Sequence, residues 1–292
     1  MAVTPAGGID IDAALAYAER HKLHALAVTR RGKLIFECYG STYAADRPHP
    51  IYSGTKSFWG VAALAAQEDG ILRLDEQVAR TIPEWEESPR KELMTVRDLL
   101  NMTAGFGFGG LGSAVPTGAA AIAAPLKTMP GATFTYGGIP LQVFGEVLRR
   151  KLGGREPHDY LRERVLDPIG LAIASWRTLK DGTRPLPTGA SLGPYEWLKF
   201  GQLLLERGTY KGKKILEPAS LAACFEPTRA NQRYGLGFWL SPFPELPSIA
   251  YASGSGGQAL YVLFSLETVV VHLGASGSWK HDTFLRKLLM RA

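Results

Sequence analysis

The sequence has 292 residues, of which 46% are hydrophobic and 21% are charged. A chain of this length and composition can bury one large core or the cores of two intertwined domains, which excludes wholesale disorder. The net charge of +6 comes from scattered lysines and arginines, and no basic stripe is interleaved with aromatic residues. Nucleic acid is therefore not an expected partner.

No apolar run approaches the roughly 20 residues that a membrane-spanning helix needs, so no membrane span is expected. Residues 1–12 lack a basic segment followed by an apolar one, and no signal peptide is expected. The default location is then cytoplasmic, or periplasmic or secreted if a signal has been removed. Cys38 and Cys224 are too few for a disulfide framework or a zinc site built from cysteine pairs, and both are interpreted as core residues.

The N-terminal part of the chain predicts one helix and one β-hairpin. The helix covers residues 11–21, where alanine and leucine supply an apolar side. The hairpin has strands over residues 24–30 and 33–39, and Arg31 and Gly32 form its turn. The following stretch, up to residue 50, is rich in turn residues and is expected to be a loop.

Helical patterns dominate the middle of the chain. Residues 53–69 predict a helix that is apolar nearly all round, which is typical of a buried helix, and Gly70 ends it. Residues 105–112 contain a G-x-G-x-G-G pattern that follows no strand and opens no helix, so it is interpreted as a flexible loop and not as a dinucleotide site. Further helices are expected over residues 95–102, 141–152, 159–166 and 194–207.

The last part of the chain is β-rich, with strands expected over residues 234–240, 249–252, 259–264 and 268–274 and a final helix from Trp279. The arrangement predicts an α+β fold: an antiparallel sheet built from both chain ends and flanked by helices, with an inserted mainly helical region. Residues 1–50 and 215–292 are expected to form a discontinuous sheet domain and residues 51–214 the helical domain.

The strongest chemical signal is an S-x-x-K pattern, Ser53 to Lys56, at the start of the buried helix. Residues three apart lie on one helical face, so the Lys56 amine can reach the Ser53 hydroxyl. A serine needs an adjacent base to become a nucleophile, and burial lowers the pKa of a lysine enough to make it one. Free N–H groups at the helix start favour the negative charge that develops beside Ser53.

The pattern has an alternative interpretation, in which Ser53 caps the helix and Lys56 is exposed in its first turn. Two features argue against it. A lysine is unfavourable in the first turn of a helix. The residues that follow are also apolar enough to bury the site.

Two further segments contain candidate residues. Tyr136 ends a short extended segment and precedes a helix, so its hydroxyl can point into a cleft, and a tyrosine beside a lysine ammonium can lose its proton and act as a base. The alternative is that Tyr136 is a packing residue. Residues 252–258 are mostly small and lead into a strand. One of their N–H groups can form an oxyanion hole together with the N–H group of Ser53. The alternative is that the segment is a plain glycine-rich turn.

A competing pattern, G-x-S-x-G, is centred on Ser191. It marks the nucleophile of an α/β-hydrolase only between a strand and a helix. A helix follows Ser191, but residues 181–188 before it are rich in proline and glycine and make a poor strand. The segment is therefore interpreted as a loop that leads into a helix.

Taken together, these segments resemble the serine β-lactamase and penicillin-binding-protein family, most closely its class C β-lactamase, DD-peptidase and esterase branch. Residues 51–58 resemble the nucleophile motif, and residues 95–106 the segment that follows it. Residues 134–148 resemble the tyrosine motif and its helix. Later segments agree in the same order, over residues 189–218 and 234–240.

The resemblance implies an active-site cleft between the sheet domain and the helical domain. It also implies acylation of Ser53, with Lys56 and Tyr136 handling the protons and Ser255 supplying the second oxyanion N–H. Two motifs depart from the family pattern. Gly138 stands where an asparagine is usual, and Ala252 where lysine or histidine is usual. Those groups help to bind β-lactams in the family, so efficient penicillin hydrolysis is not expected. The run over residues 252–258 resembles instead the esterases and 6-aminohexanoate-dimer hydrolases of the same branch.

The sequence therefore predicts a serine hydrolase that acts on a small-molecule ester or amide, with no cofactor and no metal. A DD-peptidase or weak β-lactamase is the first alternative, and a non-catalytic acyl- or penicillin-binding protein is the second. An α/β-hydrolase that uses Ser191 is a weaker one. The candidate substrate-binding residues are Trp59, Phe106, Phe108, Tyr195, Ser253, Gly254 and Gln258.

Overall fold

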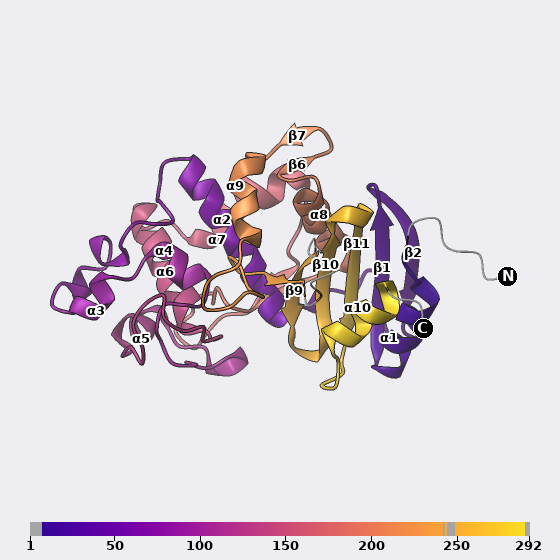
Figure 1. The fold of residues 1–292 in the computed structure, drawn as a ribbon, viewed down its shortest axis with the longest axis horizontal. Coiled ribbons are helices and arrows are strands. Elements are labelled where there is room, and N and C mark those ends of the chain that lie inside the picture. The colour runs from indigo at the N-terminus through magenta and orange to yellow at the C-terminus, as the bar shows by residue number, and fades with distance from the viewer. Residues whose placement is uncertain (1–7, 242, 244–248, 290–292) are drawn as a thin grey trace.

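A six-stranded antiparallel sheet with the order β2-β1-β11-β10-β9-β8 stands at one end of the molecule (Figure 1). The computed structural model describes residues 8–241, 243 and 249–289. The N-terminal hairpin pairs with the last strand, so both chain ends build one sheet, as the sequence predicts. The strands are β1 (Leu23–Arg30), β2 (Lys33–Tyr39), β8 (Trp239–Leu240), β9 (Ile249–Gly254), β10 (Gln258–Leu263) and β11 (Thr268–Gly274).

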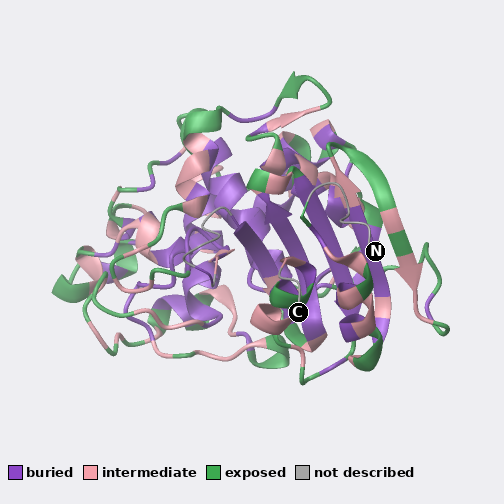
Figure 2. Ribbon diagram, turned by 45° about the vertical axis from the view of Figure 1, so that its right-hand side comes forward, coloured by how far each residue is buried: buried purple, intermediate pink, exposed green. Residues whose placement is uncertain are grey.

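Helices cover both faces of the sheet, which explains why every residue of β10 and β11 is buried (Figure 2). The helices α1 (Ile11–Arg20) and α10 (His281–Leu289) pack on one face and bury an apolar cluster beneath them. The helix α8 (Pro194–Leu205) packs on β10 and β11 from the other face. Since α8 lies within residues 51–214, part of that segment belongs structurally to the sheet layer.

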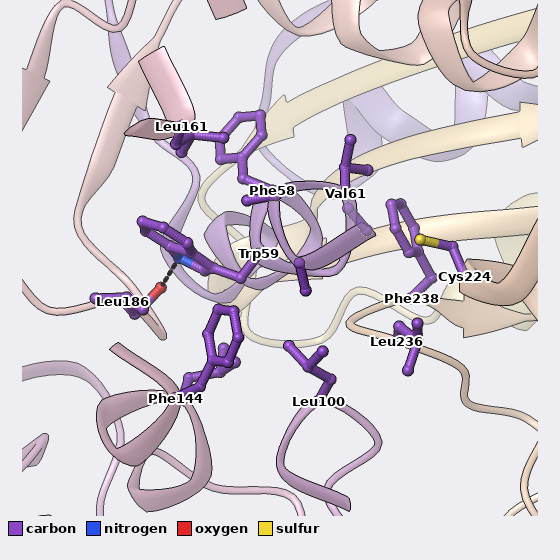
Figure 3. Packing of buried hydrophobic residues seen from close by; sticks show 14 of the residues in the cluster. Phe58, Trp59, Val61, Leu100, Phe144, Leu161, Leu186, Cys224, Leu236 and Phe238 are labelled. Atoms are coloured by element: carbon purple, nitrogen blue, oxygen red, sulfur yellow. Dashed lines mark hydrogen bonds between the residues drawn. The ribbon is translucent and has the colours of Figure 1, made fainter. Parts of the chain in front are cut away.

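The helix α2 (Lys56–Glu68) joins the sheet to the helical region. Eleven of its residues are buried, and its side chains contact neighbours on several sides (Figure 3). The Phe58 ring lies 4.7 Å from that of Phe200 in α8. One apolar cluster runs from the sheet through α2 into the helical region. Phe58 is a buried member of this cluster, so Phe58→Ala is expected to lower the free energy of unfolding by about 3–5 kcal/mol.

Apart from α6, the remaining elements are short. Two small sheets accompany the main one, with the strand orders β3-β5-β4 and β6-β7. No helix in the described part of the chain is long and apolar enough to cross a bilayer. The helices are α3 (Pro89–Glu92), α4 (Val96–Leu100), α5 (Gly118–Ala123), α6 (Ile139–Lys151), α7 (Pro157–Leu161) and α9 (Pro218–Ala222), and the strands are β3 (His49–Pro50), β4 (Ser175–Trp176), β5 (Ala190–Leu192), β6 (Thr209–Tyr210) and β7 (Lys213–Lys214).

Several predicted elements differ in the structure. The expected strand over residues 234–240 is reduced to β8, because Gly237 has a φ of +80° and its backbone lies against the Lys56 carbonyl. The expected helix over residues 159–166 ends as α7 and continues as a wider π turn. The expected loop at Ser191 is the short strand β5, so that prediction was wrong.

Candidate active site

The candidate nucleophile, Ser53, lies in a 3-10 turn (Tyr52–Thr55) directly before α2. Tyr52 has a φ of +47°, a strained backbone conformation that is uncommon outside glycine and is often found at functional sites. Gly54 is required, because a Cβ there would lie 2.7 Å from the Trp197 ring. The turn is attached to β5 through the Ile51 N–H, which donates to the Ala190 carbonyl at 3.0 Å. Ser53 itself is half-buried and accessible.

Lys56 is 1% exposed, and its Nζ lies 3.0 Å from the Ser53 Oγ. The same amine donates to the Pro187 carbonyl at 3.0 Å, which fixes its orientation. Burial disfavours the charged ammonium and lowers the pKa of Lys56 to about 7. A large fraction of the enzyme therefore carries a neutral amine at pH 7, which can accept the hydroxyl proton of Ser53.

The Lys56 amine also lies over the ring of Tyr136, with Nζ 4.6 Å from the ring centroid. Burial raises the pKa of Tyr136 to about 12, although hydrogen bonding to Ser53 and Trp239 partly opposes this. The hydroxyl therefore keeps its proton at neutral pH. The raised pKa favours Tyr136 as a proton donor, whereas the sequence suggested that it acts as a tyrosinate base.

The end of β9 lies directly against the nucleophile turn. A Cβ at Gly254 would lie 2.1 Å from the Ile51 carbonyl oxygen, so only glycine permits this approach. Ser255 follows and is exposed. Its carbonyl accepts a hydrogen bond of 2.9 Å from the buried Gln258 amide, which also pairs with the backbone of Gly274. Gln258 thus holds the turn that carries Ser255.

The glycine-rich loop, residues 105–112, packs directly against the tyrosine motif. A Cβ at Gly138 would lie 2.7 Å from the Gly110 carbonyl oxygen, and one at Gly137 would lie 2.1 Å from that of Phe108. The loop and the two glycines therefore pack backbone against backbone. In this arrangement the asparagine that is usual at position 138 does not fit.

The other candidate residues fall into different environments. Trp59 is fully buried, and its indole N–H donates to the Leu186 carbonyl at 2.7 Å (Figure 3). Phe106 is 2% exposed, near Trp85. Tyr195 is 39% exposed, and its hydroxyl bonds to Glu37 of β2. Trp59 and Phe106 therefore support the site from within the core, and a direct contact with substrate does not follow from their positions.

Ser191 is the central residue of β5, which leads into α8, so it does not lie in the sharp turn between strand and helix that a nucleophile elbow requires. Within the described residues, no hydrogen bond joins its hydroxyl to a histidine. His49, which lies in the paired strand β3, contacts His24 through one ring nitrogen and the Pro50 carbonyl through the other. Ser191 therefore has no counterpart to Lys56.

Three parts of the site carry no sequence signal of their own. The Pro187 carbonyl lies in a segment that reads only as a proline-rich loop. Trp239 packs on Tyr136, with ring centroids 5.4 Å apart, and was expected only as part of a strand. The positive φ of Tyr52 is invisible in the sequence, because tyrosine rarely adopts it.

The comparisons with solved structures agree with this architecture. A protein from Bacillus anthracis named for 6-aminohexanoate-dimer hydrolysis has a TM-score of 0.77 at 20% identity, over 92% of this chain and 78% of its own. EstCE1, described as a hydrolase with promiscuous acyltransferase activity, has a TM-score of 0.75 at 16% identity, over 95% and 96% of the two chains. At these identities the likeness shows the fold alone.

Sequence comparison gives the family. Monacolin J acid methylbutanoyltransferase from Aspergillus terreus is 28% identical over 161 residues, which are 45% of this chain and only 38% of that protein. The Beta-lactamase family model matches residues 16–290, nearly the whole sequence. The chain belongs to the Beta-lactamase family, which confirms the resemblance in the motifs.

Proposed function

We propose that the protein is a serine hydrolase that forms an acyl-enzyme on Ser53 and acts on an ester or small amide. The observation that carries this proposal is the contact between the Lys56 amine and the Ser53 hydroxyl, 3.0 Å apart, with the amine buried and the serine accessible. A buried neutral amine beside an accessible hydroxyl is the arrangement that nucleophilic catalysis needs.

In the proposed mechanism, neutral Lys56 takes the Ser53 proton while Oγ forms a bond to the substrate carbonyl carbon. The N–H groups of Ser53 and Ser255 receive the negative charge that forms on the carbonyl oxygen. Tyr136 donates its proton to the leaving group as that bond breaks, and Lys56 returns a proton to Tyr136. Water then attacks the acyl-enzyme and loses a proton to the same pair. The pair returns that proton to the Ser53 Oγ as its bond to the acyl carbon breaks and the acid is released.

An alcohol in place of water would turn hydrolysis into acyl transfer at the same serine. Two similar proteins are named for acyl transfer, which supports including an alcohol acceptor in the assays. The non-catalytic alternative, an acyl-binding protein, retains the pocket but accumulates an acyl-enzyme without turnover.

Intact-mass spectrometry with a nitrophenyl ester tests the proposal. The expected result is a transient mass increase of one acyl group, mapped to Ser53 by peptide analysis, followed by steady release of acid. A stable adduct without turnover would favour the acyl-binding alternative, and the absence of any adduct together with the absence of turnover would contradict both.

Short acyl esters are expected to be turned over with a higher kcat/KM than penicillins. Ala252 provides no charge for a β-lactam carboxylate, and the Gly110 carbonyl fills the place of an asparagine side chain at position 138. Side-by-side kinetics with nitrophenyl butanoate and benzylpenicillin measure the difference. A higher kcat/KM for benzylpenicillin would favour the β-lactamase alternative.

Tyr136→Phe is expected to lower kcat/KM on the order of 100-fold, because it removes the proposed proton donor and leaves the ring in place. Tyr234→Phe is the matched control: its ring lies 5.9 Å from that of Tyr136, and its buried hydroxyl has no hydrogen-bond partner among the described residues. The control is expected to change the rate less than about threefold. Near-normal single-turnover acylation in Tyr136→Phe would leave it as a packing residue.

A further inference from the structure

The segment over residues 185–187, Pro-Leu-Pro, is held by a side-chain donor at each of its three carbonyl groups. The Trp176 indole N–H donates to the first carbonyl at 2.8 Å. The Trp59 indole N–H donates to the second at 2.7 Å (Figure 3), and the Lys56 amine donates to the third at 3.0 Å. Since prolines have no N–H group, the single backbone donor of the segment is the N–H of Leu186.

This one N–H group donates to Oε1 of Gln142 in α6 at 2.9 Å. The other end of the same amide, Nε2, donates to the Pro116 carbonyl at 2.7 Å. A carbonyl only accepts and a backbone N–H only donates, so the two partners together fix which way the amide points. Gln142 is 6% exposed, and a Cβ at Gly145 of α6 would lie 2.9 Å from the Leu186 side chain. The helix α6 therefore holds Leu186 both by its backbone and by its side chain.

The Pro187 carbonyl at the end of this segment orients the Lys56 amine. A neutral amine has two N–H groups and one lone pair, and the lone pair must face the Ser53 hydroxyl to accept its proton. The Ser53 Oγ and the Pro187 oxygen each lie 3.0 Å from Nζ. Donation of one N–H to Pro187 restricts rotation about the last bond of the side chain, which keeps the lone pair directed at Ser53. With the carbonyl displaced, the amine would be free to turn.

We infer that Gln142 is a positioning residue for the base of the site: by holding the Leu186 N–H, it keeps the neighbouring Pro187 carbonyl against the Lys56 amine. The inference rests on the proposed hydrolase function. Among the described residues, the two hydrogen bonds of the Gln142 amide go to backbone groups, and neither goes to Lys56 or Ser53. Gln142 therefore acts through the segment and does not act on the substrate.

The position of the carbonyl also affects the charge of the base. A carbonyl oxygen accepts a stronger hydrogen bond from an ammonium than from a neutral amine, so the Pro187 contact opposes part of the lowering of the Lys56 pKa that burial causes. Displacement of Pro187 in a dry site therefore lowers this pKa further, whereas entry of water in its place would raise it. The ring beneath the amine belongs to Tyr136, which has a pKa of about 12 and stays neutral at the pH values used below.

Gln142→Met is the test variant, because it keeps the length of the side chain and removes both hydrogen bonds. Carbon-13 NMR of labelled lysine side chains in the full-length protein, assigned with Lys56→Met, measures the Lys56 pKa without turnover. The expected midpoint is near pH 7 in the wild-type protein and about half a unit to one unit lower in Gln142→Met. An unchanged or higher midpoint in the folded variant would overturn the inference.

Single-turnover acylation by nitrophenyl butanoate is the second measurement. Gln142→Met is expected to lower the maximal rate about 10–100-fold and to move the midpoint to lower pH, because fewer amines are oriented to take the proton. The dissociation constant of the ester is expected to stay within about threefold, since Gln142 does not act on the substrate. Gln142→Asn shortens the side chain so that the amide cannot span both partners. It is expected to give the same changes, and it replaces Gln142→Met if that variant does not fold.

Val147→Ala is the control for a loss of packing in α6, because Val147 is fully buried in the same helix. It is expected to lower the melting temperature and to leave the maximal rate and the midpoint unchanged. A wild-type maximal rate in Gln142→Met, or an equal loss of rate in Val147→Ala, would contradict the inference. Complete inactivity of the wild-type protein toward every ester would instead count against the proposed hydrolase function. The NMR midpoints would then still decide whether Gln142 positions Lys56, so the two proposals fail in different ways.

Discussion

Ser53→Ala is expected to reduce ester hydrolysis by several orders of magnitude, to the background rate, while the protein stays folded. The substitution removes the proposed nucleophile, and the loss of a nucleophile removes most of the rate enhancement of an enzyme that works through a covalent intermediate. Only one oxygen is lost from a half-buried position, so the melting temperature should hardly change. Steady-state kinetics and thermal unfolding measure the two effects.

Ser191→Ala is the matched control, since Ser191 lies in the other serine motif and its hydroxyl has no hydrogen bond to a base in the part of the chain that the structure describes. Its turnover is expected to stay within a fewfold of wild type. Wild-type-like turnover by folded Ser53→Ala would refute the assignment of the nucleophile. Loss of activity in Ser191→Ala alone would revive the α/β-hydrolase alternative.

Lys56→Met is expected to lower the acylation rate about 1,000-fold or more, because it removes the proposed base and keeps most of the volume. In the wild-type protein, acylation is expected to rise with pH and reach half its maximum near pH 7, since the pKa of Lys56 is about 7 and only the neutral amine accepts a proton. Single-turnover acylation between pH 5 and 9 measures both effects. A pH-independent wild-type rate would contradict Lys56 as the base.

Lys91→Met is the control for this prediction. The Lys91 amine also donates to a backbone carbonyl, that of Ile122, and also lies over an aromatic ring, that of Trp85. It is only partly buried and lies away from Ser53. Its replacement is expected to leave the pH–rate profile unchanged.

The same Lys56→Met variant is expected to be more stable than the wild type. Below about pH 7 the wild-type fold holds a buried ammonium, whereas the unfolded lysine, with a pKa near 10.5, is charged in water. From about pH 7 to 10.5 the unfolded state binds more protons than the fold, so wild-type stability rises with pH and the advantage of methionine shrinks. The gain is largest below pH 7, at roughly 5 kcal/mol as an upper bound. Denaturant unfolding at pH 6 and pH 9 measures it.

Local patterns in the sequence predict what depends on neighbours close along the chain. The hairpin of β1 and β2 follows from strand composition around Arg31 and Gly32, and both strands have the predicted bounds to within one residue. The burial of α2 follows from its apolar circumference. The closeness of Ser53 and Lys56 follows from their spacing of three, and the structure places Oγ and Nζ within hydrogen-bond distance.

The strand expected over residues 234–240 failed for a reason that no local pattern contains. Its residues have good strand composition, but the backbone of Gly237 must pass the first turn of α2, a contact between segments about 180 residues apart. Trp59 is similar: its side chain was expected at the cleft, and instead its indole N–H meets the Leu186 carbonyl in the core.

The sequence by itself predicted the sheet built from both chain ends and the closeness of Ser53 and Lys56, because these depend on periodicity and spacing. Its motifs gave the resemblance that the family model confirms. Only the tertiary structure decided the chemistry of these groups. The pKa of Lys56 depends on burial, to which the distant Pro187 and Tyr136 contribute. A pKa and a proton position are set by everything within a few ångströms, and most of those neighbours are remote along the chain.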